Sequence, residues 1–289
     1  MKNILLSFKD RTSEDDDHGG IFMKIGFLGA GAMGGAILTG ALNTGVISPE
    51  ETFVYDLSAA IKDKYRALGC NIVSSGIELG HEADLVVVSL KPQYAEGGLA
   101  ALEDSLDGKA LVSIMAGITV DTLHKWVKGN PRVLRLMPNT PALVGAGAFA
   151  LDSDTDLTEE EKLFAEKLFS SIGIVEWMPE PLIDTACGLS GAGPAYVYIM
   201  IEALADGGVF KGLPRPTAKH LAAQTVYGAA KMVLETGTHP DELKDMVCSP
   251  GGNTIVGVKA LEEHGVRGAI IDAVGRATDK ARELGQSNS

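Results

Sequence analysis

The sequence predicts a two-part α/β protein, in which a doubly wound parallel sheet is followed by an all-helical domain. Three observations predict this fold class. Short apolar segments alternate with helical ones between residues 23 and 179, as in a chain of βα units. The segment Leu85–Ser89 is apolar up to its last residue, which is typical of a strand covered on both faces. Strand patterns then end, and long helical patterns rich in alanine and glycine occupy residues 180–289.

The first 22 residues do not share this pattern. A short apolar stretch, Ile4–Leu6, is followed by a polar tract with four consecutive acids, Glu14–Asp17. The apolar stretch is too short for a secretory signal, and transit peptides lack acids. We therefore expect a disordered extension over residues 1–22, ahead of a fold that begins near Met23.

In the sheet domain, apolar runs and helical periodicity give the order of the elements. The predicted strands are Lys24–Leu28, Thr52–Asp56, Asn71–Val73, Leu85–Ser89, Ala110–Ile114, Val133–Met137 and, at the edge, Ile174–Trp177. The predicted helices are Met33–Asn43, Ser58–Leu68, Tyr94–Leu106 and Val120–Trp126. A further helix begins after Thr158, because Thr158 and Glu161 have the spacing of a capping box. The acidic segment Asp152–Asp156 before it is interpreted as a solvated loop.

Helical segments alone make up the second domain. They are Pro194–Phe210, Pro214–Glu235, Ile255–Glu263 and Gly268–Leu284. Their many small residues allow helices to approach closely, either in a compact all-α core within one subunit or in packing against a second subunit. We favour the second interpretation, because so much helix carries a large apolar surface.

Composition and charge narrow the class of protein. With 45% hydrophobic residues among 289, the chain can build a substantial core. Its formal net charge of −13 argues against nucleic acid as a partner, because phosphate binding needs clustered lysine and arginine. The three cysteines are widely spaced without a CxxC pair, which predicts structural thiols in a reducing, cytoplasmic compartment and no metal site. The apolar runs are too short to cross a membrane.

The most informative local pattern is a glycine turn between the first predicted strand and helix. Gly29 permits the tight turn, Gly31 lets the backbone approach a phosphate, and Gly34 lets helix and strand pack closely. The helix N-terminus that opens there has unpaired N–H groups for a pyrophosphate. Glycines also accumulate in ordinary turns, but Asp56 ends the next strand, where dinucleotide sites place an acid for the ribose. The sequence therefore predicts a Rossmann-type dinucleotide-binding domain over residues 23–179.

Ligands of doubly wound sheets bind outside the carboxyl ends of the strands, so the residues that follow the strands are candidates. Lys91 follows one strand and is interpreted as a general acid, a phosphate contact or a surface lysine. Ala116 and Gly117 follow the next strand and leave room for a flat ring, as in a nicotinamide cleft. Asn139 and Thr140 follow a third strand, where they either fix the turn or contact a ligand.

A second glycine-rich turn, Ser249–Thr254, opens a helix in the helical domain. Unpaired N–H groups at that helix N-terminus would attract a small carboxylate, and the hydroxyls of Ser249 and Thr254 add donors. An ordinary helix start is the alternative. The six histidines are isolated, and no His–Asp pair or metal set is evident. Two anion-binding helix ends without acid–base machinery fit hydride transfer to a substrate that is already electrophilic, such as an iminium.

From Met23 to about Gly285 the sequence resembles pyrroline-5-carboxylate reductase. The matching stretches are Gly26–Met33, Ser89–Gln93, Ala116–Thr119, Arg135–Gly145, Gly188–Tyr196, Ala205–Gly208 and Asp245–Thr254. They occur in the family's order, which makes the match specific. The resemblance implies reduction of 1-pyrroline-5-carboxylate to L-proline, the last step of proline biosynthesis, with NADPH or NADH as the cofactor.

Together, the glycine pattern and the resemblance imply the residues of the site. The cofactor contacts would be Leu28, Gly29, Ala30, Gly31, Ala32, Met33, Gly34, Asp56, Ser89, Leu90, Lys91, Pro92, Ile114, Met115 and Ala116. The substrate contacts would be Glu180, Ser249, Gly252, Asn253 and Thr254. The Thr254 hydroxyl would lie beside the ring nitrogen as the candidate catalytic proton donor. The family also implies a helical domain over residues 180–289 that builds a homodimer, often assembled further into decamers.

Two positions depart from the family's pattern. Gly76 stands where many members have an asparagine that contacts the cofactor, so that contact is lost or replaced. The second strand ends in Asp56 without the arginine that often binds a 2′-phosphate, and the Asp56 carboxylate would repel such a phosphate. We therefore expect a preference for NADH, although Lys62 and Lys64 lie nearby in the sequence.

Two other classes share some of these features. A β-hydroxyacid dehydrogenase has a Rossmann domain followed by helices, but its catalytic lysine is missing here, where Pro194–Val197 follow Gly191–Gly193. A non-catalytic dinucleotide-sensing protein would explain the first glycine turn and would leave Ser249–Thr254 without a role.

Overall fold

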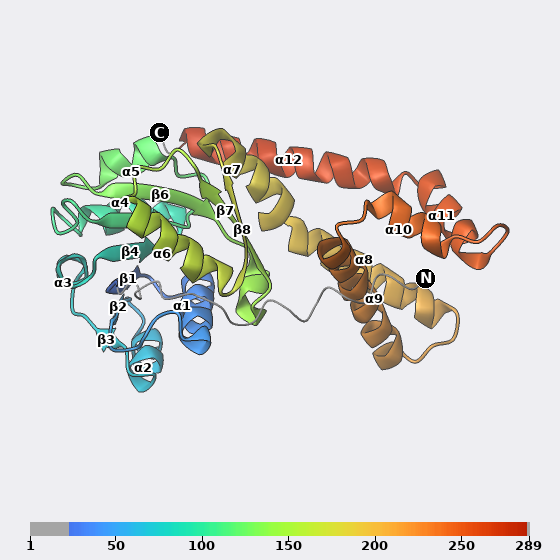
Figure 1. The fold of residues 1–289 in the computed structure, drawn as a ribbon, viewed down its shortest axis with the longest axis horizontal. Helices are drawn as coiled ribbons and strands as arrows, with labels where there is room; N and C mark the ends of the chain where they lie inside the picture. Colours follow the sequence, from blue (N-terminus) through green and yellow to red (C-terminus); the bar gives the residue numbers. More distant parts are fainter. Residues whose placement is uncertain (1–22, 288–289) are drawn as a thin grey trace, which may run out of the picture.

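The computed structural model describes residues 23–287, and the extension expected over residues 1–22 lies outside the described residues. The chain forms a sheet domain covered by helices and a helical arm that extends away from it (Figure 1). This arrangement confirms the predicted α/β class with a separate helical domain.

One eight-stranded sheet organises the first domain. Its strands lie in the order β3-β2-β1-β4-β5-β6-β7-β8. Their bounds are β1 Ile25–Leu28, β2 Thr52–Tyr55, β3 Asn71–Ile72, β4 Leu85–Val88, β5 Ala110–Ser113, β6 Arg132–Met137, β7 Gly147–Asp152 and β8 Gly173–Met178. All neighbouring pairs are parallel except β6 and β7. Because the order reverses between β1 and β4, a ligand crevice is expected at the carboxyl ends of these two strands.

Strand β7 differs from the sequence expectation. It runs antiparallel to β6, with Leu136 opposite Leu151, and extends to Asp152. The interpretation of Asp152 as part of a solvated loop is wrong, because this residue ends β7 and is buried. The small residues of the sequence Gly-Ala-Phe-Ala give β7 a weak strand signal. The edge position predicted for β8 is confirmed.

Six helices cover the two faces of the sheet. They are α1 Ala32–Thr44, α2 Ala59–Ala67, α3 Gly76–Glu82, α4 Pro92–Ala100, α5 Val120–Trp126 and α6 Glu159–Ser170. The capping box of α6 is confirmed, since Glu161 N donates to Thr158 Oγ1 and Thr158 N donates to Glu161 Oε2. The sequence pattern missed α3, and α4 ends six residues before the predicted Leu106 (106 minus 100).

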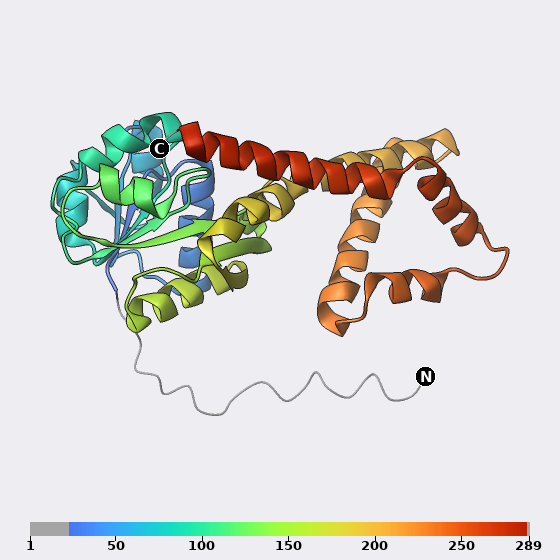
Figure 2. The same ribbon diagram turned by 90° about the horizontal axis from the view of Figure 1, so that it is seen from above.

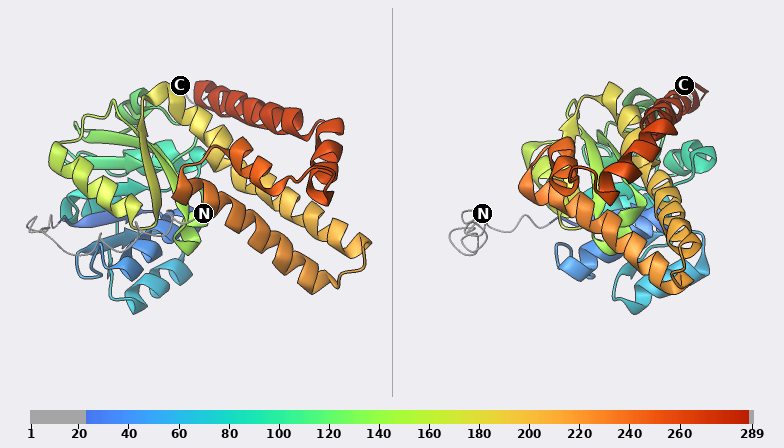
Figure 3. Two further views of the ribbon diagram at one scale, coloured as in Figure 1. Left: turned by 45° about the vertical axis from the view of Figure 1, so that its right-hand side comes forward. Right: turned by 90° about the vertical axis from the view of Figure 1, so that its right-hand side faces the viewer.

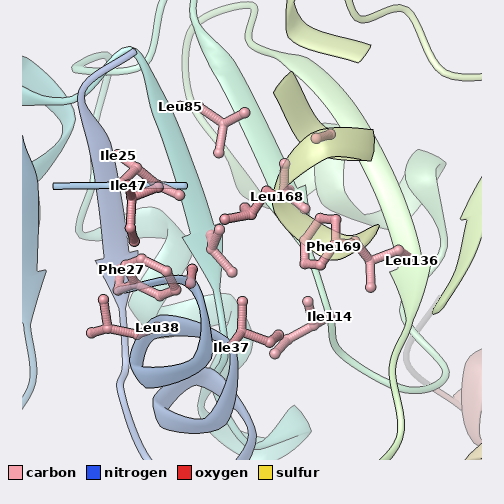
Figure 4. Close-up of a cluster of buried hydrophobic side chains, with 14 of the residues drawn as sticks. Ile25, Phe27, Ile37, Leu38, Ile47, Leu85, Ile114, Leu136, Leu168 and Phe169 are labelled. Atoms are coloured by element: carbon pink, nitrogen blue, oxygen red, sulfur yellow. The ribbon is translucent and has the colours of Figure 1, made fainter. Parts of the chain in front are cut away.

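The hydrophobic core lies on both faces of the sheet. On one face α1 and α6 pack against the strands through side chains such as Ile37 and Phe169 (Figure 4). On the other face α3 and α4 contribute Leu79 and Leu99. Alternate residues of β4 enter the two clusters, so its predicted coverage on both faces is confirmed.

The second domain consists of helices joined by short turns. They are α7 Glu180–Ala186, the π-helical turn η2 Cys187–Gly191, α8 Gly193–Phe210, α9 Arg215–Thr236, α10 Pro240–Val247, α11 Asn253–Glu263 and α12 Val266–Ser287. Helices α8 and α9 pack on each other through three buried alanines, Ala205, Ala218 and Ala222. Helices α10 and α11 have no buried residue. The interpretation of this domain as a compact all-α core in one chain is therefore wrong (Figure 3).

Helix α12 brings the chain back from the arm to the sheet domain (Figure 2). Near its end, a Cβ added at Gly117 would lie 3.2 Å from Gly285 N and 3.3 Å from Leu284 Cβ. Midway along α12, a Cβ added at Gly188 would lie 2.3 Å from Thr278 Oγ1. Glycines therefore let α12 approach both the end of β5 and the π-helical turn, so α12 contacts the sheet domain near its end and the start of the helical domain midway along its length.

Candidate functional site

The glycine turn after β1 has the geometry that the sequence predicts. Gly29 has φ +85°, a conformation that glycine adopts without strain. A Cβ at Gly34 would lie 2.6 Å from Gly29 O and 2.7 Å from Ser89 Cβ, so only glycine allows α1 to pack this closely. A Cβ at Gly31 would meet no atom within 4 Å. The backbone at Gly31 is therefore open to a ligand.

The N-terminus of α1 presents free donors at this opening. Gly34 N donates to Ser89 Oγ at 3.0 Å, and Ala30 N donates to Asp56 Oδ2 at 2.9 Å. Within residues 23–287, the N–H groups of Gly31, Ala32 and Met33 have no hydrogen-bond partner. Three free N–H groups at the positive end of a helix form an anion site, and this structure fits a pyrophosphate there.

Asp56 lies directly after β2, where its carboxylate is held by the backbone on two sides. Its Oδ2 accepts from Ala30 N, and its Oδ1 accepts from Ser58 N at 2.8 Å. Each carboxylate oxygen can accept a further hydrogen bond, so contact with ribose hydroxyls remains compatible with these bonds. The result is a fixed negative charge beside the glycine turn.

The residues after β4 form the start of α4. Lys91 is the exposed N-cap residue, and Pro92 is the first residue of the helix. Leu90 lies between the glycine turn and α4, because Cβ atoms at Gly29 and Gly98 would lie 3.2 Å and 2.3 Å from its methyl groups. Leu90 therefore fixes the distance between these two elements, and Lys91 is free to reach a ligand.

The end of β5 corrects one expectation. Ile114 and Met115 are buried and Ala116 is half-buried. The space that the sequence analysis assigned to a flat ring beside Gly117 is filled by the last turn of α12, so that prediction is wrong for Gly117. Its cause is a tertiary contact with Gly285, 168 residues further along the chain (285 minus 117).

The turn after β6 is fixed by Asn139. Its Nδ2 donates to Ser190 O at 3.1 Å, and its Oδ1 accepts from Ala148 N at 2.9 Å. Of the two roles considered for Asn139, the structure shows the one in which it fixes the turn. Gly76 stands where many family members have an asparagine. It packs under α4, and a Cβ added at Gly76 would lie 3.2 Å from Ala101 O. An asparagine at position 76 would need this contact to shift.

The second glycine turn leaves the N-terminus of α11 without a cap. Gly252 N donates to Ser249 O at 3.0 Å, and a Cβ at Gly252 would lie 2.3 Å from Ser249 Oγ. No side chain caps α11. Among the described residues, the N–H groups of Asn253, Thr254 and Ile255 have no partner. This helix end is therefore also able to bind an anion.

The two uncapped helix ends do not meet within one chain. Figures 1 and 2 show α1 in the sheet domain and α11 at the far end of the arm. The pattern of residues gave each end correctly but contained no information on their separation. A single chain therefore cannot place both ends on one small substrate.

The arm has a large exposed apolar surface. Among its exposed side chains are Tyr198, Ile199, Leu204, Phe210, Leu221, Tyr227, Met232, Leu234, Met246, Val247, Val256, Leu261 and Ile271. Apolar surface of this extent marks an interaction site rather than a solvated face. The second interpretation of the helical domain, packing against a second subunit, is compatible with this surface.

Glu180 lies at the start of α7 with its carboxylate already paired. Its Oε1 accepts from Val120 N at 2.9 Å and from Arg135 Nη1 at 3.1 Å. Arg135 Nη2 also donates to Asp184 Oδ1 at 2.5 Å. The substrate contact expected for Glu180 stays a prediction. Arg135 was not among the predicted site residues, although its charge inside the apolar run of β6 was a usable signal.

Within residues 23–287 there is neither a candidate metal site nor a candidate membrane-spanning helix. These residues contain no group of three or more His, Cys, Asp or Glu side chains placed to hold a metal ion. Over the same range, none of the helices combines the length and apolarity needed to span a membrane.

Comparisons with known proteins agree along nearly the whole chain. The family model for pyrroline-5-carboxylate reductase dimerisation matches residues 180–284, and the model for NADP oxidoreductase, coenzyme F420-dependent, matches residues 24–117. The pyrroline-5-carboxylate reductase of Arabidopsis thaliana is 44% identical over 267 residues, covering 91% of this chain and 96% of that protein. That of Escherichia coli strain K12 is 43% identical over 269 residues, covering 91% and 99%.

Solved structures give the same result. Plasmodium falciparum pyrroline carboxylate reductase with NADP bound superposes with a TM-score of 0.84 at 36% identity, covering 92% of this chain and 100% of that one. The pyrroline-5-carboxylate reductase of Coxiella burnetii superposes with a TM-score of 0.85 at 33% identity, covering 91% and 98%.

Proposed function

This chain belongs to the pyrroline-5-carboxylate reductase family, and on that premise we propose that it reduces 1-pyrroline-5-carboxylate to L-proline with NADPH or NADH. The observation that carries the proposal is the pair of uncapped helix ends. One suits a pyrophosphate and the other suits a small carboxylate. The product places this reaction at the last step of proline biosynthesis.

The free N–H groups of Gly31, Ala32 and Met33 hold the pyrophosphate, and Asp56 accepts hydrogen bonds from the ribose. The segments Ser89–Pro92 and Ile114–Ala116 line the nicotinamide end of the cleft at the carboxyl ends of β4 and β5. The bound cofactor supplies the hydride.

The substrate carboxylate binds at the N-terminus of α11. The N–H groups of Asn253 and Thr254 and the hydroxyl of Ser249 are available to it, and the helix end contributes about 0.3–1 kcal/mol of binding. The Thr254 hydroxyl then faces the ring nitrogen and donates the proton that the reduced imine needs, while a proton from solvent restores the hydroxyl. Glu180 is proposed to contact the substrate from the edge of this site.

The site is completed by two copies of the chain. Within one chain, α1 lies in the sheet domain and α11 lies at the far end of the arm. The N-terminus of α11 in one protomer therefore meets the dinucleotide cleft of its partner. The exposed apolar side chains of the arm and the description of the family model as a dimerisation domain support a homodimer. Assembly of such dimers into a decamer and a cytoplasmic location belong to the same proposal.

The experiment is a reductase assay with purified chain. It follows the absorbance of NADH and NADPH on addition of 1-pyrroline-5-carboxylate, and detects proline as the product. We expect turnover with proline formed in proportion to the cofactor consumed. Cofactor binding without turnover would contradict the proposal and support the dinucleotide-sensing alternative.

A further inference from the structure

Arg135 is buried at the junction between the sheet domain and the arm. It lies on β6, and its side chain is 3% exposed. One side of its guanidinium contacts Glu180 and the other contacts Asp184. These two acids are one turn apart on α7, so they share the helix face that lies against β6. Arg135 thus holds α7 to the sheet at two points.

The contact extends to a third element. Glu180 Oε1 also accepts from Val120 N, the first residue of α5, and Glu180 N donates to Asp154 Oδ2 at 3.4 Å. The start of α7 is therefore linked by hydrogen bonds to β6, to α5 and to the loop after β7. This set of contacts fixes the position of α7 in more than one direction.

The composition of this cluster is unfavourable for stability alone. Arg135 Nε is buried without a hydrogen-bond partner within the described part of the chain. Burial raises the pKa of the nearby Asp152 carboxyl, and the charges of Glu180 and Asp154 raise it further. Buried ion pairs are often no more stabilising than apolar residues of the same volume, but they demand a defined geometry. The cluster is therefore better suited to fixing the position of α7 against the sheet than to stabilising the fold.

The position of α7, together with the contact of α12 at Gly117, determines where the arm points. Helix α7 continues through the π-helical turn η2 into α8, and α12 packs on the same turn at Gly188 (Figure 1). Helix α8 has 18 residues and is about 27 Å long at 1.5 Å per residue. A rotation of about 10° at α7 would move its far end by about 5 Å. Displacements of about 1 Å in a reactive complex lower rates by as much as about 100-fold.

We propose that Arg135 is a positioning residue, which fixes the direction of the arm and so sets the substrate-binding end of α11 against the partner's dinucleotide cleft. This inference rests on the proposed function, because its effect on kcat is measured in the reductase assay. It predicts that loosening the contacts of Arg135 impairs turnover without impairing binding of the cofactor, because the glycine turn and Asp56 lie outside the cluster.

The test compares Arg135→Lys with the matched control Arg132→Lys. Both arginines lie on β6 and bind carboxylates, but Arg132 pairs with Glu161 of α6, within the sheet domain. Lysine keeps the charge and loses the forked geometry of the guanidinium. We expect Arg135→Lys to lower kcat by about 10- to 100-fold with an unchanged Kd for NADH, measured by fluorescence titration. Arg132→Lys should leave both quantities near wild type.

A kcat for Arg135→Lys equal to that of Arg132→Lys would overturn the proposal, and so would an NADH affinity that falls in proportion to kcat. If Arg135→Lys does not fold, Asp184→Asn removes the charge from only one of the two contacts and should lower kcat by a smaller factor with the same unchanged Kd.

Amide hydrogen exchange separates this inference from the proposed function. Exchange should accelerate in α7 and at the start of α5 in Arg135→Lys, and in α6 in Arg132→Lys. A wild-type chain that binds NADH but forms no proline contradicts the proposed function. Unchanged exchange in α7 contradicts the positioning role, whatever the wild-type chain catalyses.

Discussion

At the scale of single residues, Thr254 unites two tasks in the proposed site. Its N–H group is one of the free donors at the start of α11, and its hydroxyl belongs to a half-buried residue at the same helix end. Removing the hydroxyl leaves the N–H group in place, so binding and proton donation can be separated by mutation.

Thr254→Ala should lower kcat by about 100-fold or more, the usual range for loss of a positioned proton donor. The Kd for NADH should not change, because the substitution leaves the glycine turn and Asp56, the proposed cofactor contacts, intact. Thr254→Ser keeps the hydroxyl and is the matched control, measured by steady-state kinetics with both variants. A wild-type kcat in Thr254→Ala would leave this residue with a binding role only.

Asp56 should determine the choice between the two cofactors. Its carboxylate is held in place by Ala30 N and Ser58 N, so it cannot turn away from a 2′-phosphate without breaking these bonds. We expect kcat/KM for NADH to exceed that for NADPH, and Asp56→Asn to shift this ratio toward NADPH by about tenfold, or 1.4 kcal/mol. The ratio is measured by initial rates with both cofactors. A higher kcat/KM for NADPH in the wild-type chain would contradict the argument.

At the scale of elements, the locally encoded features of the sequence were the most predictable. The capping box of α6 depends on Thr158 and Glu161, which are three residues apart. The glycine turn likewise depends only on residues 29–34 and their neighbours. Two of the missed elements, β7 and α7, depend on tertiary contacts. Strand β7 has a weak pattern and is formed by its pairing with β6 and β8, and α7 is held by the side chain of Arg135.

Helix α6 should make stability depend on pH through Glu161. Burial acts to raise the pKa of this carboxyl, but hydrogen bonds from Arg132 and Thr158 outweigh it and hold the pKa below the ordinary value of 4.5. A folded-state pKa below the unfolded value means that stability is present above pH 4.5 and is lost as the pH falls through the folded pKa.

Glu161→Gln should therefore cost about 1.5–3 kcal/mol near pH 7, the range for hydrogen bonds to charged groups. The difference in unfolding free energy between wild type and variant should shrink as the pH falls below 4.5, measured by denaturant unfolding at several pH values. A difference that stays constant down to pH 3 would show that the Glu161 charge does not contribute.

At the scale of the whole molecule, the sequence pattern identified both uncapped helix ends but not their separation. Ser249–Thr254 and Gly29–Gly34 each have a local signature, whereas the direction of the arm depends on contacts such as Gly117 with Gly285. The same contact closed the space that had been assigned to a ring beside Gly117. Long-range packing of this kind leaves no periodic mark in the sequence, so the separation of the two helix ends could be found only from the structure.

A site formed by the cleft of one protomer and α11 of its partner can be distinguished by experiment from a site formed within one chain. Gly31→Ala should disable the dinucleotide cleft by placing a methyl group in the open space at the turn, while its Cβ meets no protein atom within 4 Å. Thr254→Ala should disable the substrate end. In a hybrid dimer of the two variants, one site carries both changes and the other site carries neither.

Mixing the two inactive variants under conditions that exchange subunits should therefore restore about one quarter of wild-type activity, since about half of the dimers are hybrids and each has one intact site. Each variant alone, treated in the same way, is the control. If each chain instead built a complete site from its own cleft and its own α11, every site in the mixture would carry one of the two changes. No activity would then return, and the shared site would have to be abandoned.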